Sequence, residues 1–158
     1  MRKLAASVVA ASAVMGLASS QALADAPKFF SADSSVSSSG ALVVTFDERG
    51  LGNENVDYTI TAQADATYAC VNKGGKNPEA ANKRSVQRPI EEGATFEPRN
   101  GRVAGSISAG PPGAGDFSCP GGQRLVLADV SYTDIVLTDT TNGVSTSVPD
   151  ASRTFMDL

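Results

Sequence analysis

The chain has 158 residues, a net charge of −4, two cysteines, and neither histidine nor tryptophan. This length favours a single domain, and a hydrophobic fraction of 41% is high enough for a packed core, which excludes a wholly disordered chain. The acidic balance argues against nucleic acid as a partner.

Residues 1–24 have the pattern of a secretory signal peptide. Arg2 and Lys3 give a positive start, residues 4–17 carry no charge, and Ala22-Leu23-Ala24 supplies the small residues of a cleavage site. The apolar run is short for a span of ~30 Å of hydrocarbon. We therefore expect cleavage after Ala24, secretion from the cell and no membrane contact afterwards. The exported chain then has 11 basic and 17 acidic residues, a net charge of −6.

The exported chain begins with a polar, serine-rich segment, residues 25–40, in which only Phe29 and Phe30 suggest the start of an edge strand. Residues 41–158 are predicted to form one β-sandwich domain. Its first strand covers residues 41–46 and ends at an acidic, glycine-containing turn.

The clearest pattern covers residues 56–70, where apolar side chains occupy every second position from Val56 to Cys70. Successive side chains of a strand point to opposite faces, so this alternation predicts a half-buried strand. Its length exceeds that of most strands, which predicts a bulge near residues 62–66. A second bulge is expected at Thr133-Asp134, where the apolar phase shifts.

Two Asn-Gly pairs predict hairpins, because both residue types tolerate the positive φ of a type I′ turn. A two-residue loop at Asn100-Gly101 places Arg99 opposite Arg102, and a four-residue loop instead pairs Glu97 with Arg102. At Asn142-Gly143 we expect Leu137 to face Val148. About seven short strands with regular turns predict an antiparallel, immunoglobulin-like β-sandwich.

Cys70 and Cys119 are the only thiols. In an exported protein such a pair is expected to form a disulfide, here one that tethers residues 56–70 to the opposite sheet. A catalytic thiol would need a histidine base, and a zinc site would need about four nitrogen or sulfur ligands.

The missing histidine also removes the common general base and the usual partner of a serine nucleophile. No phosphate-binding or dinucleotide motif occurs. Asp134 and Asp139 are candidates for calcium ligands, but no D-x-D loop accompanies them. We therefore predict no catalytic residues, no metal and no cofactor.

One basic segment stands out in the acidic chain. Residues 73–88 contain five cations and a single acid, Glu79, and residues 77–83 have the pattern of one or two helical turns. This basic segment is the candidate binding site for an anionic polymer of a cell wall or matrix, although basic residues beside a strand edge also simply prevent edge pairing. Its cations are Lys73, Lys76, Lys83, Arg84 and Arg88.

Two motifs carry a resemblance to known proteins. The run from Cys70 to Lys83, C-V-N-K-G-G-K-N-P-E-A-A-N-K, and the run F-S-C-P-G-G-Q from Phe117 to Gln123 resemble a family of small secreted bacterial proteins whose function is not assigned. The resemblance implies a secreted β-domain with one disulfide and adds no site residues.

The sequence thus favours a secreted, non-catalytic β-sandwich that acts by surface contact, with an unidentified extracellular or cell-wall partner. Two alternatives stay open. One is a carboxylate-dependent hydrolase with acids from the Glu91 and Asp134 regions, and the other is an inhibitor or effector that presents the loop at residues 111–115.

Overall fold

The computed structural model describes residues 26–72, 74 and 82–158, so the expected signal peptide and most of the expected helical turns at 77–83 lie outside the described residues. Within the described part, no helix is long and apolar enough to cross a membrane. The regular structure there consists of β1 (Lys28–Val36), β2 (Leu42–Arg49), β3 (Val56–Asn72), β4 (Lys83–Phe96), β5 (Arg102–Ala109), β6 (Gln123–Asp139), β7 (Val144–Ser147) and β8 (Ala151–Thr154).

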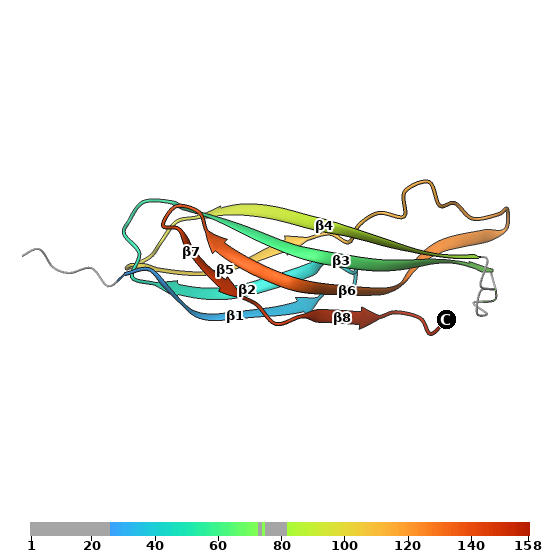
Figure 1. The fold of residues 1–158 in the computed structure, drawn as a ribbon, viewed down its shortest axis with the longest axis horizontal. Helices are drawn as coiled ribbons and strands as arrows, with labels where there is room; N and C mark the ends of the chain where they lie inside the picture. The colour runs from blue at the N-terminus through green and yellow to red at the C-terminus, as the bar shows by residue number, and fades with distance from the viewer. Residues whose placement is uncertain (1–25, 73, 75–81) are drawn as a thin grey trace, which may run out of the picture.

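The strands form two antiparallel sheets that pack face to face (Figure 1). The first sheet, sheet A, has the order β1-β2-β5, and the second, sheet B, has the order β4-β3-β6-β7, with β8 also pairing with β6. This arrangement confirms the predicted all-β class and the antiparallel sandwich.

The core lies between the sheets and is built from alternating apolar residues. Leu42, Val44 and Phe46 of β2 and Tyr58 and Ile60 of β3 are all buried. The predicted strand at residues 56–70 is confirmed as β3, because its period-2 pattern places one row of side chains in the core and the other in solvent.

Three strands of sheet B continue past the end of sheet A (Figure 1). The pairing of β2 with β5 ends at Leu42 and Ala109, whereas the pairing of β3 with β6 runs on to Asn72 and Gln123. We call residues 66–72, 83–87 and 123–129 the extension. It needs cover on its inner face, since sheet A does not reach it.

The loop at residues 110–122 supplies this cover. The Tyr68 hydroxyl donates to the carbonyl of Pro112 at 2.8 Å, and Cys70 forms the predicted disulfide with Cys119. The disulfide is therefore confirmed. The expectation that it tethers residues 56–70 to the opposite sheet is wrong, because Cys119 belongs to this loop and not to a strand of sheet A.

The two predicted bulges are one irregularity in the pairing of β3 with β6, at Ala62 opposite Asp134, and a second, at Ala128, was not predicted. The register shifts between Thr61 and Gln63 and again between Thr67 and Tyr68. In both cases the extra residue belongs to β6, and at the first shift Asp134 adopts a φ of 52°. An inserted residue re-aims its neighbours, and here the side chain of Asp134 is exposed.

The serine-rich segment at residues 25–40 contains a strand that the sequence pattern obscured. β1 pairs with β2 over its whole length, so the sandwich begins at Lys28 rather than at residue 41. A bulge at Phe30 changes the phase of the inward side chains, from Phe29 before it to Ala32 and Val36 after it. This change of phase breaks the alternation that would have indicated a strand.

The hairpin at Asn100-Gly101 has the two-residue loop. Asn100 and Gly101 have φ values of 54° and 73°, and Arg99 lies opposite Arg102. The structure thereby selects the register in which two cations face each other, and excludes the pairing of Glu97 with Arg102.

The second hairpin has a longer loop than expected. Asp139 pairs with Val144, so Leu137 faces Thr146, and the prediction that it faces Val148 is wrong. The reason is local, because the Asp139 carboxylate accepts hydrogen bonds from the backbone N and the side-chain amide of Asn142 and so closes a four-residue turn.

Candidate functional site

The predicted basic segment is only partly described. Lys73 and Lys76 lie outside the described residues, whereas the other three cations belong to β4, an edge strand of sheet B. The expected grouping of all five therefore stays a prediction.

The three described cations of that segment do not share one surface. Arg84 and Arg88 pair with Tyr68 and Ala64 and project from that side of the strand, whereas Lys83 projects from the other side. Arg84 and Arg88 occupy core-facing positions at an exposed edge, an arrangement that opposes pairing with another sheet.

A different group of cations is brought together at the opposite end of the molecule. Lys28 pairs with Arg49, Arg49 pairs with Arg102, and Arg102 forms a bridge with Arg99. Directly opposite residues of antiparallel strands point to the same face, so these four exposed side chains form one line across sheet A. We call Lys28, Arg49, Arg102 and Arg99 the cationic row.

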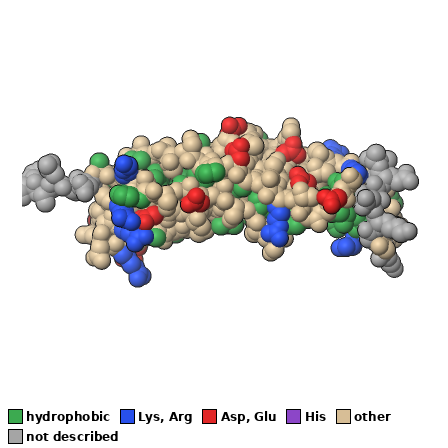
Figure 2. Space-filling model, turned by 90° about the horizontal axis from the view of Figure 1, so that it is seen from below, with side chains coloured by type: hydrophobic (Ala, Val, Ile, Leu, Met, Phe, Trp, Pro, Cys, Tyr) green, Lys and Arg blue, Asp and Glu red, His purple; other side chains and the backbone are tan. Residues whose placement is uncertain are grey.

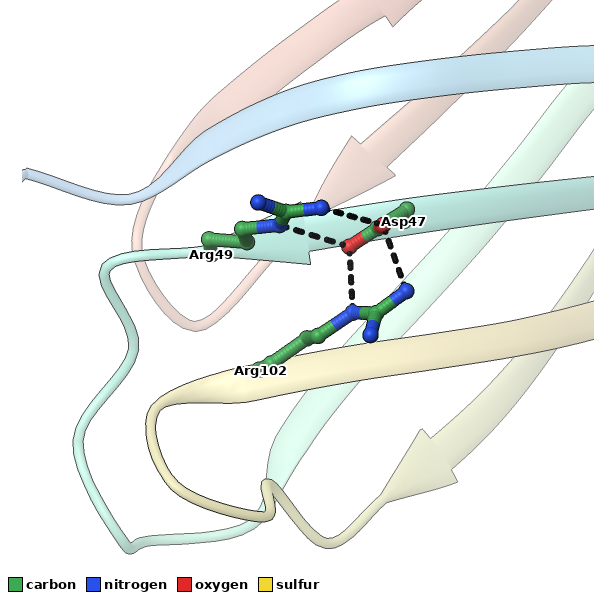
Figure 3. Close-up of polar contacts among 3 residues, drawn as sticks. All are labelled: Asp47, Arg49 and Arg102. Carbon is green, nitrogen blue, oxygen red and sulfur yellow. Dashed lines mark hydrogen bonds and ion pairs between the residues drawn. The ribbon is translucent and has the colours of Figure 1, made fainter.

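Asp47 holds the two central arginines of the cationic row (Figure 3). The Nε and Nη2 groups of Arg102 donate to Oδ1 and Oδ2 of Asp47 at 2.9 and 2.7 Å, and the same groups of Arg49 donate at 3.4 and 3.1 Å. These hydrogen bonds, those from Arg102 first, lower the pKa of Asp47 to about 2. Asp47 thus contacts two of the four cations, and the row together with Asp47 carries a charge of +3.

The cationic row ends at two shallow hollows. One, of about 410 Å³, is lined by Lys28, Phe30 and Arg49, and the guanidinium of Arg49 lies over the Phe30 ring at 4.3 Å from its centroid. The other, of about 420 Å³, is lined by Arg99 and Arg102 and also by the acid Glu97. Phe30 stays 59% exposed, which makes it the most exposed large apolar side chain of the described part.

The acids proposed for hydrolysis line a third hollow. Glu91 and Asp134 both border a space of about 280 Å³ on the outer face of sheet B, with Thr61 and Gln63 between them. The structure therefore brings together the two regions named from the sequence. Asp139 is buried elsewhere, and among the described residues no three acidic or cysteine side chains gather as metal ligands.

A buried acid pair lies behind the cationic row. Glu48 and Asp139 are both 0% exposed, and the Tyr58 hydroxyl donates to Oε2 of Glu48 at 2.7 Å across the sandwich. Burial raises the pKa of Glu48, the Tyr58 hydroxyl lowers it, and the charge of Asp139 raises it again. Oε1 of Glu48 has no hydrogen-bond partner among the described residues, and burial of this carboxyl group disfavours its charged form.

The surface charge is unevenly distributed. Figure 2 shows the densest group of Lys and Arg side chains at one end of the molecule, with other such side chains near the middle and toward the opposite end. The outer face of sheet B instead presents Asp57, Asp65, Glu91 and Asp129 at positions where paired strands carry mainly serine, threonine and glutamine. A polyanion therefore meets attraction at the cationic row and repulsion along sheet B.

Comparisons with known proteins return no match: no family model, no curated protein and no solved structure is similar to this chain.

The cationic row was missed from the sequence because its members are far apart in the chain. The available signal was positional, since Lys28, Arg49, Arg99 and Arg102 all stand next to strand ends or turns. The burial of Glu48 had a clearer signal in the sequence. Glu48 continues the row of apolar residues at every second position of β2, so it shares their inward face.

Proposed function

We propose that this chain is an exported, non-catalytic β-sandwich protein that binds an anionic extracellular or cell-wall polymer through the cationic row. The observation that carries the proposal is the line of four exposed cations across sheet A, with Asp47 as the carboxylate that contacts it. Cations directly opposite one another destabilise a sheet. Because four cations in one line do not help the sheet to fold, binding of an anionic ligand explains their arrangement better than fold stability does.

Other features support the remaining parts of the proposal. Export is favoured by the pattern of residues 1–24 and by the disulfide between Cys70 and Cys119, a bond typical of oxidising compartments. A binding role is favoured by the lack of histidine. We also propose that the sandwich is immunoglobulin-like, which its two antiparallel sheets favour. The resemblance to small secreted bacterial proteins is a further part of this proposal.

The proposal is tested by the binding of the exported chain to immobilised polygalacturonate at several salt concentrations. Replacing Arg49, Arg99 and Arg102 by Gln is expected to weaken binding about tenfold at low salt, since exposed cation contacts contribute up to about 1 kcal/mol each. The matched control replaces Lys83, Arg84 and Arg88 by Gln, which removes the same charge from the other end.

The control variant is expected to bind nearly as well as the original chain, and binding should weaken as salt screens the row. Equal losses in both variants would show a response to net charge and contradict a site at the row. A loss only in the β4 variant would assign binding to the basic segment instead.

A second candidate function is carboxylate-dependent hydrolysis. The observation in its favour is that Glu91 and Asp134 line one hollow, as such a reaction requires of its two acids. The reaction also needs one acid that is protonated at working pH, which requires an environment that disfavours its charge. Both side chains are exposed, and this makes hydrolysis the weaker candidate.

The hydrolase candidate predicts release of reducing sugar ends from a polysaccharide, and loss of that activity in a Glu91→Gln, Asp134→Asn variant. Asparagine tolerates the positive φ at position 134, so this variant should keep the fold. Absence of release by the original chain on neutral, acidic and amino-sugar polymers would exclude the candidate.

A further inference from the structure

The two central arginines of the cationic row are held in place before any ligand arrives. Arg49 and Arg102 approach the Asp47 carboxylate from two neighbouring strands, each through its Nε and Nη2 groups (Figure 3). The Asp47 side chain is only 16% exposed, whereas those of Arg49 and Arg102 are 49% and 52% exposed. The acid therefore lies below the two guanidinium groups and supports them from the sheet.

Arg49 is restrained on a second side as well. Its guanidinium carbon lies 4.3 Å from the centroid of the Phe30 ring, which is brought there by the bulge in β1. A guanidinium that stacks on an aromatic ring and bonds to a carboxylate loses little further freedom when it binds. Phe30 and Asp47 together set the plane of this group.

Each arginine keeps unused donors. A guanidinium has five N–H groups in a planar fork, and the bonds to Asp47 use the edge formed by Nε and Nη2. In the described part of the chain, Nη1 of Arg49 and Nη1 of Arg102 donate to no protein acceptor. The outer edge of each guanidinium, formed by Nη1 and the second N–H of Nη2, thus stays available. Each such edge can bind a group with two coplanar oxygens.

We propose that Asp47 is a positioning residue, which orients Arg49 and Arg102 for bidentate binding of successive carboxylate groups on an acidic polysaccharide. This inference rests on the proposed function and specifies its ligand. Arg49 and Arg102 come from neighbouring strands, which lie about 4.8 Å apart. Two carboxylates of one polymer chain can therefore each meet one arginine, and the exposed Phe30 offers an apolar surface for a sugar ring.

The decisive experiment is Asp47→Asn, because two explanations predict opposite results. If charge alone determines binding, the removal of an acid should tighten the complex with polygalacturonate. If Asp47 positions the arginines, the variant should bind at least fivefold more weakly, with an unchanged salt dependence, since the number of cations in contact is the same.

Asp33→Asn is the matched control, because Asp33 lies on the same outer face of sheet A but pairs with Thr45, away from the row. It should bind as tightly as the original chain or slightly more tightly. Phe30→Ala provides a second variant that removes the other restraint on Arg49, and a loss of affinity is expected there too. Thermal melting of all three variants checks that the fold is kept.

Tighter or equal binding by Asp47→Asn would overturn the positioning role and leave the proposed function intact. If the variant with Arg49, Arg99 and Arg102 replaced by Gln bound as tightly as the original chain, that result would instead contradict the proposed function. Poly(glycerol phosphate) serves as the other source of oxyanions. Stronger binding to it than to polygalacturonate would overturn the assignment of carboxylates as the ligand.

Discussion

Glu48 shows how one buried carboxyl group couples the two sheets. Its Oε2 accepts the Tyr58 hydroxyl from sheet B, and Asp139, which pairs with Tyr58 on the next strand, lies near enough to raise its pKa. Rings of Phe46, Phe96 and Phe29 surround Tyr58, with the nearest centroid 4.7 Å away. A charge in such a setting has little solvation, so the neutral carboxyl is favoured.

The raised pKa of Glu48 determines how stability depends on pH. In the unfolded chain this group titrates near its ordinary value of 4.5, and in the folded chain it titrates higher. The folded state thus binds more protons than the unfolded state. The contribution of Glu48 to the free energy of unfolding is therefore fully present below the pKa that this group has in the unfolded chain, and it is lost as pH rises through the pKa that it has in the folded chain. Asp47 has the opposite effect on the pH dependence of stability, because its pKa is lowered in the folded chain. Its contribution to the free energy of unfolding is lost as pH falls through its folded pKa of about 2.

We predict that the free energy of unfolding decreases as pH rises from 4.5 through the raised pKa of Glu48, and that Glu48→Gln removes most of this decrease. The amide of glutamine can donate to Asp139 and accept from Tyr58 with no charge, so the variant should be more stable at pH 7.5 by about 1 kcal/mol. Urea unfolding at both pH values measures this, with the exposed Glu54→Gln as control. A variant less stable than the original chain at pH 7.5 would contradict the neutral carboxyl.

At the scale of elements, the extension depends on a loop for its inner surface. β3 and β6 pair beyond sheet A, and there Tyr68 and Cys70 contact the loop at residues 110–122 instead of a second sheet. The disulfide is the covalent link between this part of the sheet and the loop, so it stabilises this part of the molecule most directly.

We predict that Cys70→Ala, Cys119→Ala lowers the free energy of unfolding by roughly 4 kcal/mol at most, the value of the chain-entropy model for a loop of this length. The loss should be local before it is global. Hydrogen exchange is expected to speed up first in residues 66–72 and 123–129, with slower change around Ile60 and Leu137. Uniform acceleration over all strands would contradict an independently weakened extension.

At the scale of the whole molecule, the sheets also meet along their edges. The Ser34 hydroxyl donates to the carbonyl of Pro149, and Arg153 donates to the carbonyl of Val36, so β1 is joined to the segment around β8. These contacts link sheet A to sheet B next to an otherwise open edge. The sandwich therefore behaves as one body that carries the cationic row at one end and the extension at the other.

This separation has a consequence for binding. A polymer held by the cationic row, as proposed, lies across the end of sheet A, at the opposite end of β2 from the start of the disulfide loop (Figure 1). The extension and the basic residues Lys83, Arg84 and Arg88 would then remain accessible on the bound molecule. The tests with paired Gln variants at the two ends measure these two regions separately.

Much of the fold could be predicted from local patterns. The alternation at residues 56–70 predicted β3, the Asn100-Gly101 pair predicted a hairpin, and the two cysteines predicted a disulfide. Each of these depends on a few neighbouring residues or on the count of one residue type. The strand at Lys28–Val36 could not be predicted in the same way, because the bulge at Phe30 reverses its alternation.

The candidate site was not predictable to the same extent, because it depends on register. Arg99 and Arg102 were recognised as a pair only under one of two possible turns, and Lys28 and Arg49 join them only through the pairing of β1, β2 and β5. A shift of one residue would have placed alternate side chains on the opposite face. Nothing local to any one strand specifies that choice.

The amino-acid sequence by itself determined that segments such as residues 56–70 are extended, which side of that strand faces inward, and which chemistries lack their side chains. These are short-range properties, set by the two-residue period of a strand and by composition. Only the tertiary structure decided that Lys28, Arg49, Arg99 and Arg102 form one line and that Glu48 meets Asp139. Such contacts join residues distant in the chain, and they exist only once the sheets have paired and packed.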